Sequence, residues 1–217
     1  MKAPSFAYAR PRSLAEVFAL LEAHGDGAKL LAGGQSLVTL LNLRLSAPEV
    51  VIDITRVPGL SGIQSVDGHI HIGALTTHAE VGGSSEIAES LPLLAQAAPQ
   101  IAHPAIRNVG TFGGSLALGD PSTEWPACCV ALDAQIVIAS TRGSRRIRAR
   151  DFFKGLYSTD LKTDEVLTGV EIPVLGDPYR SAFLELARRR GDYAIVGIAA
   201  VAKASGDALS DVPLVVR

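Results

Sequence analysis

Two short glycine-rich segments are the residues of this 217-residue sequence whose types and spacing best suit chemistry. Residues 32–36 read Ala-Gly-Gly-Gln-Ser (the first glycine loop), and residues 108–115 read Asn-Val-Gly-Thr-Phe-Gly-Gly-Ser (the second glycine loop). Because glycine has no Cβ, backbone N–H groups in such segments can approach an anion closely. The hydroxyls of Ser36, Thr111 and Ser115 add donors. We expect the loops to face each other around a pyrophosphate; for each loop alone, the alternative is a tight turn with positive φ.

Other chemistry is not indicated by the sequence. Neither loop is a P-loop or the G-x-G-x-x-G dinucleotide fingerprint. The adjacent Cys128 and Cys129 suit neither a disulfide nor a zinc site, and are expected to be buried apolar residues. The histidines have no metal-ligand spacing, although His69 and His71 are expected to share one face of a hairpin. We find no nucleophile or acid–base constellation, so the loops indicate binding rather than catalysis.

The first glycine loop is expected between a strand and a helix. Ser13 and Glu16 form a capping-box pattern at the start of an amphipathic helix. An apolar strand over residues 29–32 then runs directly into the loop. A second helix is predicted to start near Ser36, and its positive end would favour an anion. A buried strand over 50–53 completes the unit.

The rest of the chain reads as a mixture of helices and strands. Asp67-Gly68 predicts a hairpin turn between strands over 60–63 and 69–72. Helices are expected over 75–81, 86–98 and 123–132, and an irregular segment over 101–118. Further strands are expected over 135–139, 145–148, 165–172, 182–188 and 195–202. The pattern predicts an α+β fold with three parts, residues 1–55, 56–177 and 178–217.

Composition limits the class of protein. The chain has 20 Lys and Arg against 22 Asp and Glu, so its formal net charge of −2 gives no general attraction to nucleic acid or anionic membranes. Its hydrophobic share of 47% suits a globular fold. No apolar run reaches the roughly 18 residues of a membrane helix. The N-terminus has no secretory signal pattern, and a cytoplasmic protein is expected.

Four linked segments resemble one protein family. They are Lys-Leu-Leu-Ala-Gly-Gly-Gln-Ser-Leu (29–37), Ile-Arg-Asn-Val-Gly-Thr-Phe-Gly-Gly-Ser-Leu-Ala (106–117), Asp-Pro-Ser-Thr-Glu (120–124) and Arg-Arg-Arg-Gly-Asp-Tyr-Ala-Ile-Val (188–196). Their order and spacing resemble, over nearly the whole chain, the FAD-binding medium subunit of the molybdenum hydroxylases, the family of xanthine dehydrogenase and aerobic carbon monoxide dehydrogenase.

The resemblance implies a two-part FAD-binding fold of the vanillyl-alcohol-oxidase (PCMH) type, with a shortened C-terminal domain. It implies non-covalent FAD with its pyrophosphate on both loops, its adenosine near an acidic residue, and its ring beside Leu167 and Tyr193. Capping is the alternative for Asp120 and Glu124, and plain core for Leu167 and Tyr193. The residues that the resemblance assigns to FAD are Leu30, Leu31, Ala32, Gly33, Gly34, Gln35, Ser36, Thr111, Phe112, Gly113, Gly114, Ser115, Asp120, Glu124, Leu167 and Tyr193.

The resemblance also implies a function in electron transfer. FAD in this subunit would take electrons from [2Fe–2S] clusters in a small partner subunit and pass them to an external acceptor, while a large molybdopterin subunit oxidises the substrate. The complex would be a dimer of such heterotrimers. The run Arg188 to Arg190 is either part of a docking face or a solvated strand end. Two other functions remain open: a shortened, non-catalytic scaffold without FAD, and a self-contained flavin oxidase.

Overall fold

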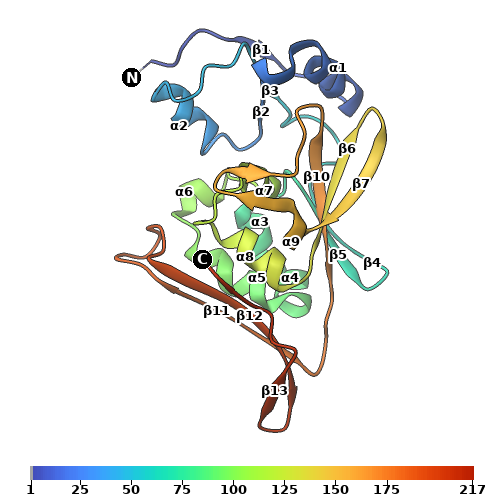
Figure 1. Ribbon diagram of the computed structural model, residues 1–217, viewed down its shortest axis with the longest axis vertical. Coiled ribbons are helices and arrows are strands. Elements are labelled where there is room, and N and C mark those ends of the chain that lie inside the picture. The colour runs from blue at the N-terminus through green and yellow to red at the C-terminus, as the bar shows by residue number, and fades with distance from the viewer. Residues whose placement is uncertain (1) are drawn as a thin grey trace.

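A computed structural model describes residues 2–217, and its N-terminal part is a small parallel sheet (Figure 1). The strands β1 (Ala7–Ala9), β3 (Val50–Asp53) and β2 (Ala28–Leu31) pair in parallel in that order. Helix α1 (Leu14–His24) packs its buried Val17 and Leu21 on this sheet, and the short helix η1 (Gly25–Gly27) follows. Helix α2 (Leu37–Asn42) follows the first glycine loop. The predicted order of helix, strand, glycine turn, helix and strand is confirmed.

The middle of the chain forms a five-stranded antiparallel sheet in the order β4-β5-β10-β6-β7. Its strands are β4 (Ile63–Val66), β5 (His69–Gly73), β6 (Gln135–Ser140), β7 (Gly143–Arg148) and β10 (Val166–Pro173). The predicted hairpin turn is confirmed: Asp67 and Gly68 both have positive φ, 49° and 76°. The strand expected to begin at Leu60 begins instead at Ile63, because the Leu60 carbonyl accepts a hydrogen bond from Leu75.

Short helices cover one face of this sheet. They are α3 (His78–Gly83), α4 (Ser85–Ser90), α5 (Pro92–Ala97), η2 (Ala98–Gln100), α6 (Pro104–Arg107), α7 (Phe112–Leu118), α8 (Glu124–Ala131) and α9 (Ala149–Phe152). A small ribbon of β8 (Phe153–Gly155) and β9 (Ser158–Thr159) lies beside them. The core between helices and sheet includes Trp125, Phe112 and both cysteines, all fully buried, so the expectation for the cysteines is confirmed.

Three predictions for the helical region were wrong in part. The helix expected over 75–81 begins only at His78, because Thr77 caps it in a capping box with Glu80. The single helix expected over 86–98 is two helices, because Pro92 lacks the N–H that would continue α4 and instead starts α5. The segment 101–118, expected to be irregular, contains α6 and α7.

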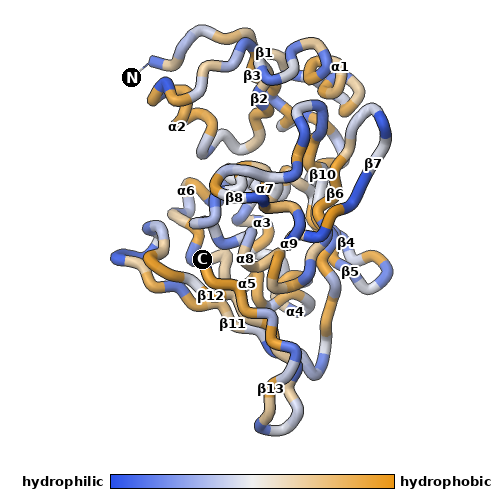
Figure 2. Tube along the Cα trace, viewed as in Figure 1, coloured by the Kyte–Doolittle hydropathy of each residue, from blue (hydrophilic) through white to orange (hydrophobic). Residues whose placement is uncertain are grey.

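The C-terminal strands form a separate sheet (Figure 1). Strands β11 (Tyr179–Leu186) and β12 (Val196–Ser205) pair along their length, and β13 (Ala208–Ser210) and β14 (Leu214–Val216) both pair with β12. One face packs on α5 and α8. The other face exposes apolar side chains, and the hydrophobic colour of β12 is visible in Figure 2. No helix within residues 2–217 is long and apolar enough to cross a membrane.

Candidate functional site

The first glycine loop presents a run of uncommitted backbone donors. It leaves β2 after Leu31 and enters α2 at Leu37. Across residues 2–217, no protein atom accepts a hydrogen bond from the backbone N–H groups of residues 33–36. Gly34 has a φ of 71°, which favours glycine, and the Gln35 side chain donates to the Gly33 carbonyl at 3.1 Å. Four successive free N–H groups in a turn are a site for an anion.

The second glycine loop is different, because most of its backbone N–H groups already donate to protein acceptors. Phe112 N–H donates to the Thr76 carbonyl at 2.8 Å, and Gly113 N–H donates to the Ala74 carbonyl at 2.9 Å. Helix α7 starts inside the loop, with the Thr111 hydroxyl as its N-cap accepting from Gly114 N–H at 3.2 Å. The expectation of an N–H nest in this loop was therefore wrong. What the loop can offer a ligand is the hydroxyl groups of Thr111 and Ser115.

The two loops do face each other, as expected. A Cβ built on Gly33 would lie 2.1 Å from the Val109 carbonyl oxygen and 2.8 Å from the Gly110 Cα. A Cβ built on Gly114 would lie 3.8 Å from the Ala32 Cβ. Segments that are about 75 residues apart in the chain thus meet backbone to backbone.

The two acidic residues after the second loop are buried and already have protein partners. Asp120 Oδ1 accepts from the Ser122 N–H at 2.9 Å and from the Ser122 hydroxyl at 2.6 Å. Glu124 begins α8 and pairs with Arg217 at 3.2 Å. Burial raises the pKa of the Glu124 carboxyl, and the Arg217 guanidinium opposes this shift. In the structure, Asp120 stabilises the turn before α8 and does not cap the helix, whose N-cap residue Thr123 makes no side-chain capping hydrogen bond.

Leu167 and Tyr193 occupy contrasting environments. Leu167 is 4% exposed in β10 and belongs to the main core, opposite Ile138. Tyr193 is 72% exposed in the connection between β11 and β12, so it is no ordinary core residue. Partial burial and the neighbouring Asp120 raise the pKa of the Tyr193 phenol. Its ring is therefore available to a ligand on the side of the molecule where Asp120 lies.

A buried histidine next to the second loop was missed from the sequence. His78 is 6% exposed, and its Nδ1 accepts a hydrogen bond from Trp125 Nε1 at 2.9 Å. A Cβ on Gly110 would lie 2.8 Å from His78 Nε2. The capping-box pattern of Thr77 and Glu80 was the available signal that a helix, and hence this histidine, begins here.

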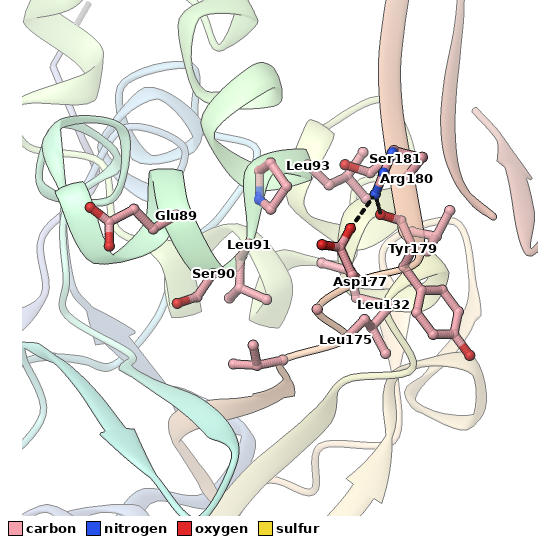
Figure 3. Close-up of a pocket in the computed structure, with 14 residues that line it drawn as sticks. Glu89, Ser90, Leu91, Leu93, Leu132, Leu175, Asp177, Tyr179, Arg180 and Ser181 are labelled. Carbon is pink, nitrogen blue, oxygen red and sulfur yellow. Dashed lines mark hydrogen bonds and ion pairs between the residues drawn. The ribbon is translucent and has the colours of Figure 1, made fainter. Parts of the chain in front are cut away.

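Two open pockets lie away from the glycine loops. A cavity of about 300 Å³ opens between α4, α5 and the start of β11, and the Asp177–Arg180 ion pair stands at its edge (Figure 3). A second, of about 470 Å³, lies on the outer sheet face beside His69 and His71, which share that face as expected. Among the described residues, no group of three or more His, Cys, Asp or Glu side chains is placed to hold a metal ion.

Comparisons with known proteins identify the family of the chain. Residues 4–175 match the family described as the FAD binding domain in molybdopterin dehydrogenase. The chain is 43% identical over 216 residues to the nicotine 6-hydroxylase medium subunit of Paenarthrobacter nicotinovorans, covering 100% of this chain and 75% of that protein. It is 40% identical over 209 residues to the carbon monoxide dehydrogenase medium chain of Hydrogenophaga pseudoflava, covering 96% and 73%.

The fold is also that of a solved relative. A structure of carbon monoxide dehydrogenase from Hydrogenophaga pseudoflava, lacking the Mo-pyranopterin moiety of its cofactor, matches with a TM-score of 0.97 and 40% identity. The match covers 100% of this chain and 75% of that chain. The predicted two-part α+β architecture is confirmed by this likeness.

Proposed function

The chain belongs to the family of FAD-binding domains of molybdopterin dehydrogenases, and we propose that its first glycine loop binds the pyrophosphate of FAD. The protein is an FAD-binding, electron-transferring oxidoreductase subunit of the molybdenum hydroxylase type. The observation that carries the residue assignment is the run of four backbone N–H groups, residues 33–36, without a protein acceptor. A pyrophosphate supplies the several anionic oxygens that such a run of donors suits.

The second loop contributes to the same site through its side chains. The Thr111 hydroxyl, which accepts from Gly114 N–H, would donate its proton to the phosphate from the opposite side. The Ser115 hydroxyl donates to the Thr123 hydroxyl at 3.3 Å and would exchange this bond for one to the phosphate. Gly114 allows the two loops to approach, because its Cβ would lie 3.8 Å from the Ala32 Cβ. Gly113 and Phe112 hold the second loop on the core: a Cβ on Gly113 would lie 2.5 Å from the Ala74 Cβ, and Phe112 packs on Trp125. The side of the proposed site next to the first loop is formed by Leu30, Leu31, Ala32, Gln35 and Ser36.

The remaining assignments follow from position along this site. Asp120 and Glu124 shape the turn beside the adenosine, and the second carboxylate oxygen of Asp120 is the group left to bind a ribose hydroxyl. Tyr193 covers the flavin ring from its exposed position, and a tyrosine ring can stack on it and exclude water. Leu167 supports the site from the core beneath. FAD is held without a covalent link.

The chain acts by binding and orientation. FAD, when bound, supplies redox chemistry that accepts and releases electrons one or two at a time. The free N–H groups of residues 33–36 neutralise the phosphate charge and anchor the cofactor at its middle. Anchoring there leaves the ring end to be positioned by Tyr193 and by the electrostatics of the surrounding residues.

The partners are inferred from the same family. Relatives are named as medium chains or as subunits of dehydrogenase complexes, so the chain is a component of a multi-subunit enzyme. The chain has only two cysteines, fewer than the four that ligate one [2Fe–2S] cluster. We assign the clusters to a small partner subunit and the molybdopterin to a large one, in a dimer of heterotrimers. The exposed Arg188 to Arg190 form part of the docking face.

The three larger sheets support a division of the chain into three parts. Residues 1–55 include the parallel sheet, residues 56–177 the five-stranded sheet with its helices, and residues 178–217 the C-terminal sheet. Under this division, the first and second glycine loops belong to different parts, and the FAD site lies at their boundary.

Flavin analysis of the purified chain tests this function. We expect one FAD per chain, released completely into the supernatant when the protein is denatured. Flavin that remains with the precipitated chain would contradict non-covalent binding, and a chain that takes up no FAD would favour the scaffold alternative. Turnover of an organic substrate by the isolated chain would favour the self-contained oxidase.

A further inference from the structure

His78 contacts the second glycine loop through both its backbone and its ring. Its backbone N–H donates to the Gly110 carbonyl at 3.0 Å. Its imidazole lies against the Gly110 Cα, where a Cβ would stand 2.8 Å from Nε2. The preceding residue, Thr77, forms an isolated antiparallel bridge with Thr111. Thr77 and His78, two successive residues at the start of α3, therefore both contact the second loop.

The imidazole is held from its other side by Trp125, in α8. Trp125 Nε1 donates to His78 Nδ1 at 2.9 Å. An indole N–H can only donate, so Nδ1 carries no proton. Burial and the charge of Arg107 lower the pKa of His78 to about 4. The ring is therefore neutral at neutral pH and remains an acceptor for Trp125.

Trp125 connects this hydrogen bond to the loop itself. It is fully buried, and its ring centroid lies 5.0 Å from that of Phe112, a residue of the second loop. Phe112 N–H in turn donates to the carbonyl of Thr76, two residues before His78. His78, Trp125 and Phe112 therefore form a closed set of contacts that joins α3, α8 and the loop.

We propose that His78 is a positioning residue of the FAD site, whose imidazole, fixed by Trp125, holds the second glycine loop where Thr111 and Ser115 meet the phosphate. This inference rests on the proposed function. Without the ring, the Trp125 N–H is buried without an acceptor, and a space opens beside Gly110. The loop then loses its fixed distance from the first loop, and FAD binds more weakly.

Two substitutions at His78 distinguish a role in positioning the second loop from a role in the stability of the whole fold. His78→Leu fills similar space but removes the acceptor, and we expect about tenfold weaker FAD binding. His78→Asn places an amide oxygen near the position of Nδ1, so it restores the acceptor, and its affinity is expected within about threefold of the parent. Affinity is measured by titrating the flavin-free chain with FAD and following flavin fluorescence.

The single tryptophan provides a second readout that does not depend on FAD. In the flavin-free chain, the emission of Trp125 is expected to shift in His78→Leu and to return to the parent value in His78→Asn. Backbone amides of Phe112 and Gly113 are expected to exchange about tenfold faster with solvent in His78→Leu. Amides of Val51 and Ile52, in β3, are expected to be unchanged.

Leu93→Val is the matched control, because Leu93 is fully buried and lines the cavity of Figure 3, away from both loops. It is expected to lower stability without weakening FAD binding. The proposal is overturned if His78→Leu binds FAD like the parent, if His78→Asn loses as much as His78→Leu, or if Leu93→Val weakens FAD equally. A parent chain that binds no FAD contradicts the proposed function instead, and the amide exchange still tests the positioning of the loop.

Discussion

Gly33 and Val109 touch through their backbones: a Cβ on Gly33 would stand 2.1 Å from the Val109 carbonyl oxygen. This contact joins the first glycine loop to the second and leaves no room for any side chain. Gly33 is thus required by the packing of the loops, whereas the free N–H groups of its neighbours are what a ligand would bind.

Gly33→Ala is therefore expected to destabilise the fold as well as the site. The new methyl group must push the second loop away, and overpacking of this kind costs about 2 kcal/mol of unfolding free energy. Thermal unfolding should show a clearly lower Tm even without FAD. Gly83→Ala is the control, because nothing lies within 4 Å of its Cβ and Ala favours a helix. Equal Tm values for Gly33→Ala and the parent would contradict the backbone contact.

Gly34→Ala tests the conformation of the first loop. Gly34 has a φ of 71°, which costs an L-residue about 1 kcal/mol or more, and its Cβ would lie 3.1 Å from the Val38 side chain. We expect FAD affinity to fall about tenfold as the free N–H groups are redirected. Gly68→Ala, at a φ of 76° in the distant β4–β5 turn, carries similar strain and should bind FAD normally. Similar FAD affinities in the two variants would show that the first loop is not the phosphate site.

Stability should depend on pH through His78. Its pKa is lowered from 6.5 to about 4 by burial and by Arg107, so between these pH values the unfolded chain binds a proton that the folded chain does not. The stabilising contribution is complete above pH 6.5 and decreases as the pH falls, by at most about 1.4 kcal/mol per pH unit. Urea unfolding at several pH values should show a shallower decrease for His78→Asn than for the parent. If the unfolding free energy decreased equally with falling pH in both proteins, the pKa of His78 would lie near its ordinary value.

Tyr193 should affect the properties of the flavin more than its affinity. The side chain is 72% exposed, so its removal costs the fold little. We expect most of the FAD binding free energy to come from the pyrophosphate and adenosine ends. Tyr193→Ala is expected to change flavin fluorescence or reduction potential, and Tyr193→Phe, which keeps the ring, to behave like the parent. An unchanged spectrum and potential in Tyr193→Ala would remove Tyr193 from the site.

Local signals in the sequence predicted several elements well. The cap formed by Ser13 and Glu16, and the Asp67-Gly68 turn, depend only on neighbouring residues, so the pattern was sufficient. Pro92 was an equally local signal for the break between α4 and α5. The high glycine content of the second loop made α7 hard to predict. The only local signal for this helix is the Thr111 hydroxyl, which caps it three residues before Gly114.

Contacts between distant residues could not be predicted in this way. The second loop has no free N–H nest because the carbonyls of Ala74 and Thr76 lie beside it, about 36 residues earlier in the chain. The partner of Glu124 is Arg217, which is 93 residues away. Tertiary packing determines such pairs of contacting residues, and a single sequence contains no pattern that predicts them.

Nuclear magnetic resonance can show whether the backbone N–H groups of residues 33–36 bind the pyrophosphate of FAD. An isotope-labelled, flavin-free chain would be titrated with FAD while each backbone amide is followed. We predict that the amides of Gly33, Gly34, Gln35 and Ser36 shift and become protected from exchange, whereas those of Phe112 and Gly113 are protected before FAD is added. FAD binding that leaves the amides of residues 33–36 unchanged would contradict the account.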